Sequence, residues 1–181
     1  LDKFQGFSFN HKQPLSLPPR SDCIDCTKTF RKVGKHVKLF QELQVLLPQN
    51  DPFFTGLFQG KAGDKSLLNC WVKLEDPRKP CLSSLAFFLD ALPPPVINMT
   101  PSFWVPTLEL TVHFWSKPNQ SSSDIGTPKD EEDDYWVQGK FETTFATNGL
   151  LYTDAEIWSP NGKELLATSR QYARVLEPKK Q

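Results

Sequence analysis

One segment near the middle of the chain constrains the fold more than any other: residues 81–92, CLSSLAFFLDAL. As a helix, this segment has leucines at helical spacing, with phenylalanines and alanines on most of the remaining circumference. The proline triplet at 93–95 ends it abruptly, because proline cannot continue a helix. A helix that is apolar on nearly every side has to be enclosed, so the rest of the chain is expected to wrap around it.

Asp90 is the only charged residue in this helix. An ionised carboxylate without a partner in apolar surroundings costs several kcal/mol. Asp90 therefore either turns outward at the end of the helix or has partners and a function. For a lone aspartate near a helix end, the outward position is the commoner one.

Segments with strand-like patterns flank this helix. Two precede it and four follow it, at residues 36–47, 66–75, 103–115, 135–146, 150–158 and 163–176. Asn161-Gly162 predicts a hairpin between the last two segments. Long antiparallel strands after a single buried helix predict the α+β class and the hot-dog fold, a curved antiparallel sheet wrapped around one long helix.

The segment 103–115 shows the two-residue period of a strand whose faces differ in solvation. Thr107, Glu109, Thr111 and His113 alternate with leucine, valine and phenylalanine. This alternation places Thr107 on the polar face together with Glu109 and Thr111. We expect His113 at a cleft edge or an interface.

Residues 1–31 have no sustained period and read as a linker or an N-terminal arm, so the domain is expected at 32–181. Within it, residues 116–134 are rich in serine and acidic residues and predict a flexible insertion. The loop that follows the first strand contains Phe53, Phe54 and Phe58. We expect these apolar side chains to contact a partner.

Composition excludes several classes of function. Basic and acidic residues balance at 21 each among the 181 residues, which argues against a nucleic-acid or anionic-membrane surface and favours a small molecule or a protein as partner. No membrane span or export signal is visible, so we expect a cytoplasmic or peroxisomal protein. Cys23 and Cys26 form a C-x-x-C without companion ligands, so neither a metal nor another cofactor is expected.

Three blocks of sequence support the predicted hot-dog fold and indicate a family: LAFFLDA at 85–91, PTLELTVHFW at 106–115 and GLLYTDAEIWSPNGKELLATSRQYARVL at 149–176. On these blocks the chain resembles the C-terminal half of the acyl-CoA thioesterase II family, especially the double hot-dog thioesterase-like proteins of fungi. His113 departs from the family, which usually has an aromatic residue there. The first hot-dog half of those proteins is absent from this chain.

The resemblance implies three catalytic residues, Asp90, Thr107 and Gln171, which in the family jointly hold an attacking water. The implied activity is hydrolysis of a medium- to long-chain acyl-CoA. A carboxylate in apolar surroundings holds a proton more tightly and is a suitable base for this water. The alternative is a non-catalytic hot-dog half that binds acyl-CoA or has a structural role. In either case we expect pairing with a second hot-dog domain or a homo-oligomer.

Overall fold

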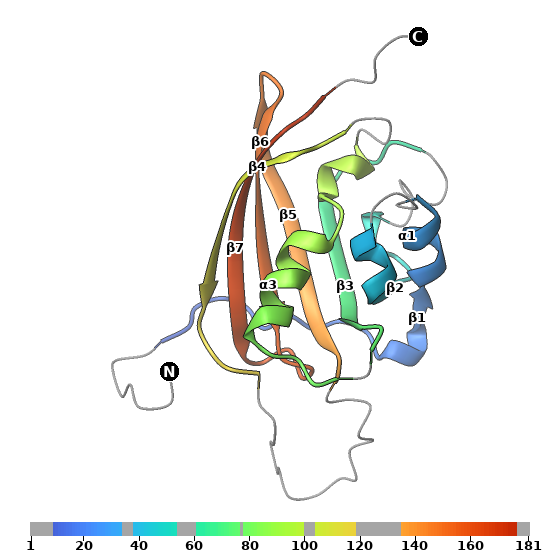
Figure 1. Ribbon diagram of the computed structural model, residues 1–181, viewed down its shortest axis with the longest axis vertical. Helices are drawn as coiled ribbons and strands as arrows, with labels where there is room; N and C mark the ends of the chain where they lie inside the picture. Colours follow the sequence, from blue (N-terminus) through green and yellow to red (C-terminus); the bar gives the residue numbers. More distant parts are fainter. Residues whose placement is uncertain are drawn as a thin grey trace, which may run out of the picture.

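The computed structural model describes residues 9–33, 38–53, 61–76, 78–99, 104–118 and 135–176. In these ranges the chain forms one antiparallel sheet with the strand order β1-β2-β3-β5-β6-β7-β4 (Figure 1). The strands are β1 (Cys23–Asp25), β2 (Leu43–Pro48), β3 (Leu67–Leu74), β4 (Thr107–Phe114), β5 (Val137–Thr147), β6 (Leu150–Trp158) and β7 (Leu165–Arg174). The two α-helices are α1 (Thr27–Val33) and α3 (Leu82–Ala91). The expected α+β class and hot-dog architecture are confirmed.

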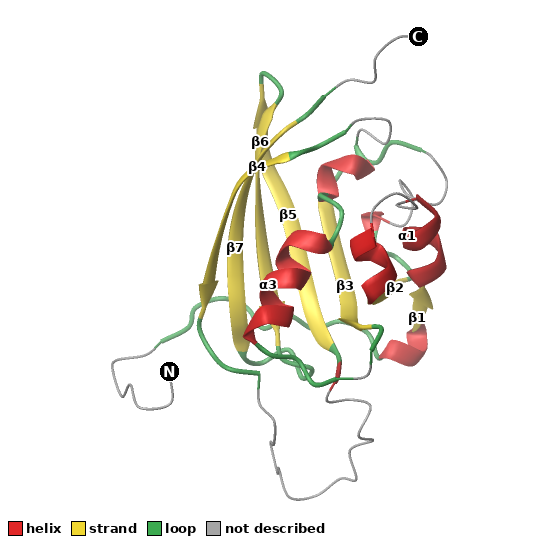
Figure 2. Cartoon of the chain, in the orientation of Figure 1, coloured by secondary structure: helices red, strands yellow, loops and turns green. Residues whose placement is uncertain are grey.

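Helix α3 lies across one face of this sheet and contacts β4, β6 and β7, while α1 packs on β2 (Figures 1 and 2). We call the face under α3 the inner face and the opposite one the outer face. Cys81 occupies the N-cap position of α3, and its backbone N–H donates to the Ser84 hydroxyl at 2.7 Å. The helix ends at Ala91, and Leu92 is its C-cap, just before the proline triplet. No helix in the described ranges is long and apolar enough to cross a membrane.

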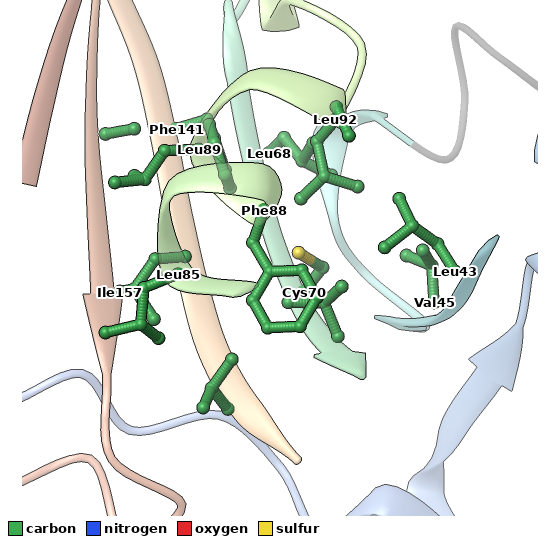
Figure 3. Close-up of a cluster of buried hydrophobic side chains, with 14 of the residues drawn as sticks. Leu43, Val45, Leu68, Cys70, Leu85, Phe88, Leu89, Leu92, Phe141 and Ile157 are labelled. Atoms are coloured by element: carbon green, nitrogen blue, oxygen red, sulfur yellow. The ribbon is translucent and has the colours of Figure 1, made fainter. Parts of the chain in front are cut away.

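The core lies between α3 and the inner face (Figure 3). Leu85, Phe88 and Leu89 point from the helix onto side chains of the sheet. Those side chains include Leu43, Val45, Leu68, Cys70, Phe141 and Ile157. Phe88 is fully buried in this cluster.

The sheet encloses only one side of α3, whereas the sequence pattern predicts enclosure all round. Ser83 and Asp90 are exposed, and Ala86 and Phe87 are half-buried between them. These four residues share one side of the helix, because residues three and four apart are neighbours on a helix surface. We call them the open side of α3. Its apolar members, Ala86 and Phe87, keep part of their surface exposed in the described part of the chain, although Phe87 also packs against the edge of the core.

Strands β5, β6 and β7 pair in sequence order as hairpins, but β4, which comes before β5 in the chain, does not lie beside β5. It pairs with the far side of β7 and forms the edge of the sheet. The tight two-residue turn is at Asn148-Gly149, where both residues have positive φ, 51° and 74°. Asn161-Gly162 lies instead in the longer link between β6 and β7, where the Asn161 side chain accepts from the Lys163 N–H at 3.0 Å.

Two expected strands are shorter than their patterns suggest. Residues 38–42 form a 3-10 helix before β2, and Phe40 packs edge-on against Phe30 of α1. Strand β4 begins only after Pro106, since proline has no N–H for the strand ladder. Before it, Trp104 pairs alone with Leu176.

The N-terminal region, expected to be a linker or an arm, contains a strand of the sheet and most of a helix. Strand β1 joins the sheet beside β2, and the predicted boundary at residue 31 falls inside α1. Upstream, the Trp71 Nε1–H donates to the Pro18 carbonyl at 3.0 Å, and the Leu15 carbonyl lies against Gly162. A Cβ at Gly162 would lie 1.7 Å from that oxygen, so only glycine fits there.

Two predicted features fall on parts that the structure does not describe. Residues 119–134 of the predicted insertion lie outside the described residues, as do Phe54 and Phe58. Phe53, expected to seek a partner, is fully buried and stacks on Phe30 with ring centroids 6.1 Å apart.

Candidate active site

A β-bulge near the start of β4 decides which way Thr107 points. Thr107 is paired with Ala173 and Glu109 with Tyr172, so β4 has one residue more than β7 at this point. Paired residues share a face of the sheet, and Ala173 is buried beside Val96 on the inner face. Thr107 therefore belongs to the inner face, while Glu109 lies on the outer face. The simple alternation that puts Thr107 and Glu109 on one face is wrong, because the bulge interrupts it.

Gln171 of β7 faces the same way as Thr107. It is paired with Leu110 of β4 and with Thr153 of β6, and its side chain is half-buried. The Gln171 Nε2–H donates to Thr107 Oγ1 at 2.6 Å. Two of the three residues implied by the family resemblance are thus in direct contact.

Asp90 lies near the end of α3, the helix that contacts β4, β6 and β7. Its side chain is exposed on the open side of the helix. Among the described residues the carboxylate makes no hydrogen bond or ion pair. Within the described ranges the carboxylate therefore lacks the apolar surroundings expected for a catalytic base, because the sheet covers the other side of α3.

His113 lies away from this region, on the outer face. Its ring stacks on Trp115 with centroids 6.0 Å apart. Both residues line an open groove together with charged side chains of β5, β6 and β7. The groove and the Thr107–Gln171 contact lie on opposite faces of the sheet, so His113 is not part of the same site.

Cys23 and Cys26 are near each other at the start of the fold, and both are free thiols. Cys26 is buried, and its burial raises the pKa of the thiol to about 12. Its Sγ–H donates to the Ile24 carbonyl at 3.3 Å. No group of three or more metal-ligating side chains is assembled within the described ranges.

Comparison with protein-family models identifies the family of this chain. Residues 20–175 match the model of the acyl-CoA thioesterase C-terminal domain. The chain belongs to this family. The matched range includes Asp90, Thr107 and Gln171, as well as β1 and α1.

Solved structures of low sequence identity share the fold. A candidate thioesterase II from Thermobifida fusca is 22% identical with a TM-score of 0.68, over 98% of this chain and 59% of that one. A hot-dog protein of unknown function from Alicyclobacillus acidocaldarius is 19% identical with a TM-score of 0.68, over 97% and 59%. An acyl-CoA thioesterase II from Mycobacterium marinum is 18% identical with a TM-score of 0.56, over 97% and 60%. No curated protein sequence gives a significant match.

The acyl-CoA thioesterase domain described here spans about three fifths of the length of these structures. Each of them therefore has a further region with no counterpart in this chain.

Proposed function

We propose that this domain hydrolyses the thioester of an acyl-CoA, with Asp90, Thr107 and Gln171 acting on one water molecule. The observation that carries the proposal is the 2.6 Å hydrogen bond from Gln171 to Thr107. It joins two polar side chains of neighbouring strands on the inner face, where Gln171 is half-buried and Thr107 is exposed. Membership of the acyl-CoA thioesterase family supports the same activity.

The reaction needs a water that loses a proton as it attacks. In the proposed step the water oxygen forms a bond to the thioester carbonyl carbon, and the Asp90 carboxylate accepts the proton. The tetrahedral intermediate then collapses, the C–S bond breaks, and the CoA sulfur leaves with the electron pair and takes the proton back from Asp90. The products are a fatty acid and the CoA thiol, and no cofactor takes part. A positioned base typically accelerates such a step by about a hundredfold to ten-thousandfold.

Thr107 and Gln171 supply the orientation that a single carboxylate cannot. The Gln171 amide fixes the Thr107 hydroxyl by donating to its oxygen, so the Thr107 proton is free to donate elsewhere. A water that accepts from Thr107 and donates to Asp90 keeps one lone pair for the carbonyl carbon. Holding the water in this geometry lowers the entropic part of the barrier.

The open side of α3 and the free edge of β4 favour a second hot-dog unit as partner. Ala86 and Phe87 leave apolar surface uncovered on α3, and Leu108 on β4 is 56% exposed. A partner seated there would bury this surface and enclose Asp90. The unit would be a second copy or a separate hot-dog domain, and the medium- to long-chain acyl group would bind between the two units.

The exposure of Asp90 is the observation that favours the alternative, a non-catalytic half that binds acyl-CoA or stabilises a catalytic partner. The two functions differ in one measurable respect. Only the thioesterase releases CoA thiol at a rate that depends on Asp90.

The test is thiol release from a panel of acyl-CoA chain lengths by the wild type and by Asp90→Asn, with native mass spectrometry of both. We expect a paired assembly, and we expect the variant to lose roughly a hundredfold to ten-thousandfold in turnover while keeping its fold. Equal rates for the two proteins, in preparations free of host thioesterases, would refute the catalytic role. The binding or structural function would then replace it.

A further inference from the structure

Strand β4 forms the edge of the sheet, and one side of its backbone has no neighbouring strand in the described part of the chain. The N–H and C=O groups of an antiparallel strand point alternately toward one neighbour and toward the other. The Trp115 N–H donates to the Leu166 carbonyl of β7 at 2.9 Å, so the odd-numbered residues of β4 direct these groups at β7. The even-numbered residues from 110 to 114 therefore direct theirs at the free edge.

This edge lacks the usual protection against another strand. Many proteins protect a free edge with lysine or proline, or keep it very short, because its unpaired groups accept a further strand. Strand β4 has eight residues and contains neither lysine nor proline. Its bulge lies at the start, between Thr107 and Glu109, so the rest of the strand is regular. A strand that pairs here would satisfy the free backbone groups and cover Leu108, which is 56% exposed.

The outer-face side chains of β4 are complementary to those of a second β4 strand. In an antiparallel pair with a two-fold axis through Thr111, Glu109 of each copy lies opposite His113 of the other. Thr111 then lies opposite the same residue of the other copy. Across strands, a carboxylate accepts from an imidazole N–H and threonine pairs are favourable. Within the described ranges Glu109 accepts only from the Thr111 hydroxyl, at 3.3 Å, so it has room for this partner.

The same axis also matches the inner-face side chains and the backbone. Leu110 lies opposite Val112, and Leu108 lies opposite Phe114, each pair occurring twice. Residues 110 and 112 direct their N–H and C=O groups at the free edge, so they exchange hydrogen bonds with the second strand. The pairs between them, on the outer face, are the closer kind without hydrogen bonds, with Cα atoms about 4.5 Å apart.

Other positions of the axis fit less well. An axis through Leu110 or Val112 places Glu109 opposite Thr111 or Trp115, and the contact with His113 is lost. An axis through Glu109 sets two carboxylates directly opposite each other, which is destabilising. An axis between two residues sets a free backbone group against one that is already bonded to β7. The axis through Thr111 is therefore the one that satisfies charge, apolar contact and backbone together.

We propose that two copies of this chain pair through β4 in this register and join their sheets into one. The inference rests on the proposed function, because it identifies the partner unit expected beside β4 as a second copy. The two inner faces then form one surface, with both α3 helices on the same side. Phe114 of the partner subunit lies opposite Leu108, next to Thr107. Each copy thus contributes an apolar side chain beside the candidate site of the other.

The first test determines the register by disulfide formation in the full chain. All variants carry Cys81→Ser, because Cys81 is exposed and would itself cross-link. Thr111→Cys places two thiols opposite each other at a Cα separation that suits a disulfide. We expect this variant to form a covalent dimer on mild oxidation. Glu109→Cys and His113→Cys are the matched controls: each alone should stay uncross-linked, and the two combined should cross-link.

The second test exchanges the members of the outer-face pair and needs no oxidation. Glu109→His sets two imidazoles opposite each other, and His113→Glu sets two carboxylates opposite each other. Either change should raise the Kd of the dimer by roughly twofold to thirtyfold, because both copies of the pair are lost. The double variant rebuilds the pairs in reverse order and should return the Kd to the wild-type value. Analytical ultracentrifugation measures the Kd, and Lys140→Gln, on β5, should leave it unchanged.

The outcomes separate the pairing from the proposed function. A wild type that is monomeric in native mass spectrometry would overturn the pairing, as would cross-linking of Glu109→Cys alone without that of Thr111→Cys. Added losses in the exchanged double variant would overturn the register. If Thr111→Cys cross-links while Asp90→Asn hydrolyses acyl-CoA at the wild-type rate, the pairing stands and the thioesterase mechanism fails. If Asp90→Asn loses activity in a protein that stays monomeric, the mechanism stands and the pairing fails.

Discussion

The two faces of the β4–β7 pair carry polar side chains of different kinds. On the inner face, Thr107 and Gln171 are uncharged and bond to each other at 2.6 Å. On the outer face, Arg170 forms an ion pair with Asp154, with N–O distances of 2.8 and 3.0 Å. Arg170 and Gln171 are neighbours in sequence, so one step along β7 separates the two environments.

This contrast shows why similar-looking residues are expected to have different roles. Exposed ion pairs add little to stability, because water already solvates both charges. On the inner face, Gln171 is half-buried and its amide donates to the Thr107 hydroxyl. Removal of the hydroxyl or the amide of this pair should therefore affect function, while the outer face should tolerate the same change.

The largest effect is expected on stability, when a phenylalanine is truncated in the core or on the exposed side of the sheet. Phe88→Ala removes a fully buried ring and should lower the free energy of unfolding by about 3–5 kcal/mol. Phe145→Ala is the matched control, because Phe145 is 58% exposed, and it should change stability by at most about 0.5 kcal/mol. Urea unfolding of both variants measures the difference. Equal losses would mean that the outer end of β5 is covered by a partner.

A smaller effect is expected from threonines of one strand that face opposite ways. Thr107→Val should lower kcat for acyl-CoA hydrolysis by roughly threefold to tenfold, because it removes the hydroxyl bonded to Gln171. Thr111→Val, on the outer face opposite Arg170, should leave kcat unchanged. A loss in Thr111→Val as large as that in Thr107→Val would break the distinction between the faces.

The buried carboxyl group of Asp51 should make the stability of the protein depend on pH. Burial raises the pKa of Asp51, although the Phe53 N–H and the Asn69 N–H both donate to it at 2.9 Å. The folded protein then holds this proton more tightly than the unfolded chain does. Stability from this group is therefore fully present below the unfolded pKa, about 4, and is lost as pH rises through the folded value. The urea midpoint of the wild type should therefore fall as pH rises through the folded pKa of Asp51, while that of Asp51→Asn should not. Parallel pH profiles of the urea midpoint in the two proteins would contradict the raised pKa of Asp51.

The smallest effect is expected at the outer-face ion pair. Arg170→Ala leaves Asp154 in water, so neither the urea midpoint nor the hydrolysis rate should change measurably. Wild type and variant are compared at low and high salt. A clear loss of activity in Arg170→Ala would show that the outer-face groove takes part in function.

Much of the fold follows from hydrophobic patterning alone. The apolar helix, its proline stop and the long strands after it predict one helix on an antiparallel sheet, as observed. The order of the strands does not follow, because β4 crosses to the far side of β7 and its pattern carries no sign of its neighbours. Strand β1 is too short, with three residues, to show a period.

The family resemblance predicts candidate site residues, but the sequence does not predict their geometry. The family resemblance points to Thr107 and Gln171, and the structure brings them into contact. The alternation in β4 puts Thr107 on the outer face, since a bulge changes the register without leaving a mark in the pattern.

The central claim is that Asp90, Thr107 and Gln171 act on one water. The most direct measurement is kcat/KM for Asp90→Asn, Thr107→Val and Gln171→Ala, singly and combined, with one acyl-CoA substrate. Residues that act as a unit give effects far short of additive in free energy. We therefore predict that the triple variant loses little more than Asp90→Asn alone. Single losses that multiply in the triple variant would show three independent contributions and would contradict the shared water.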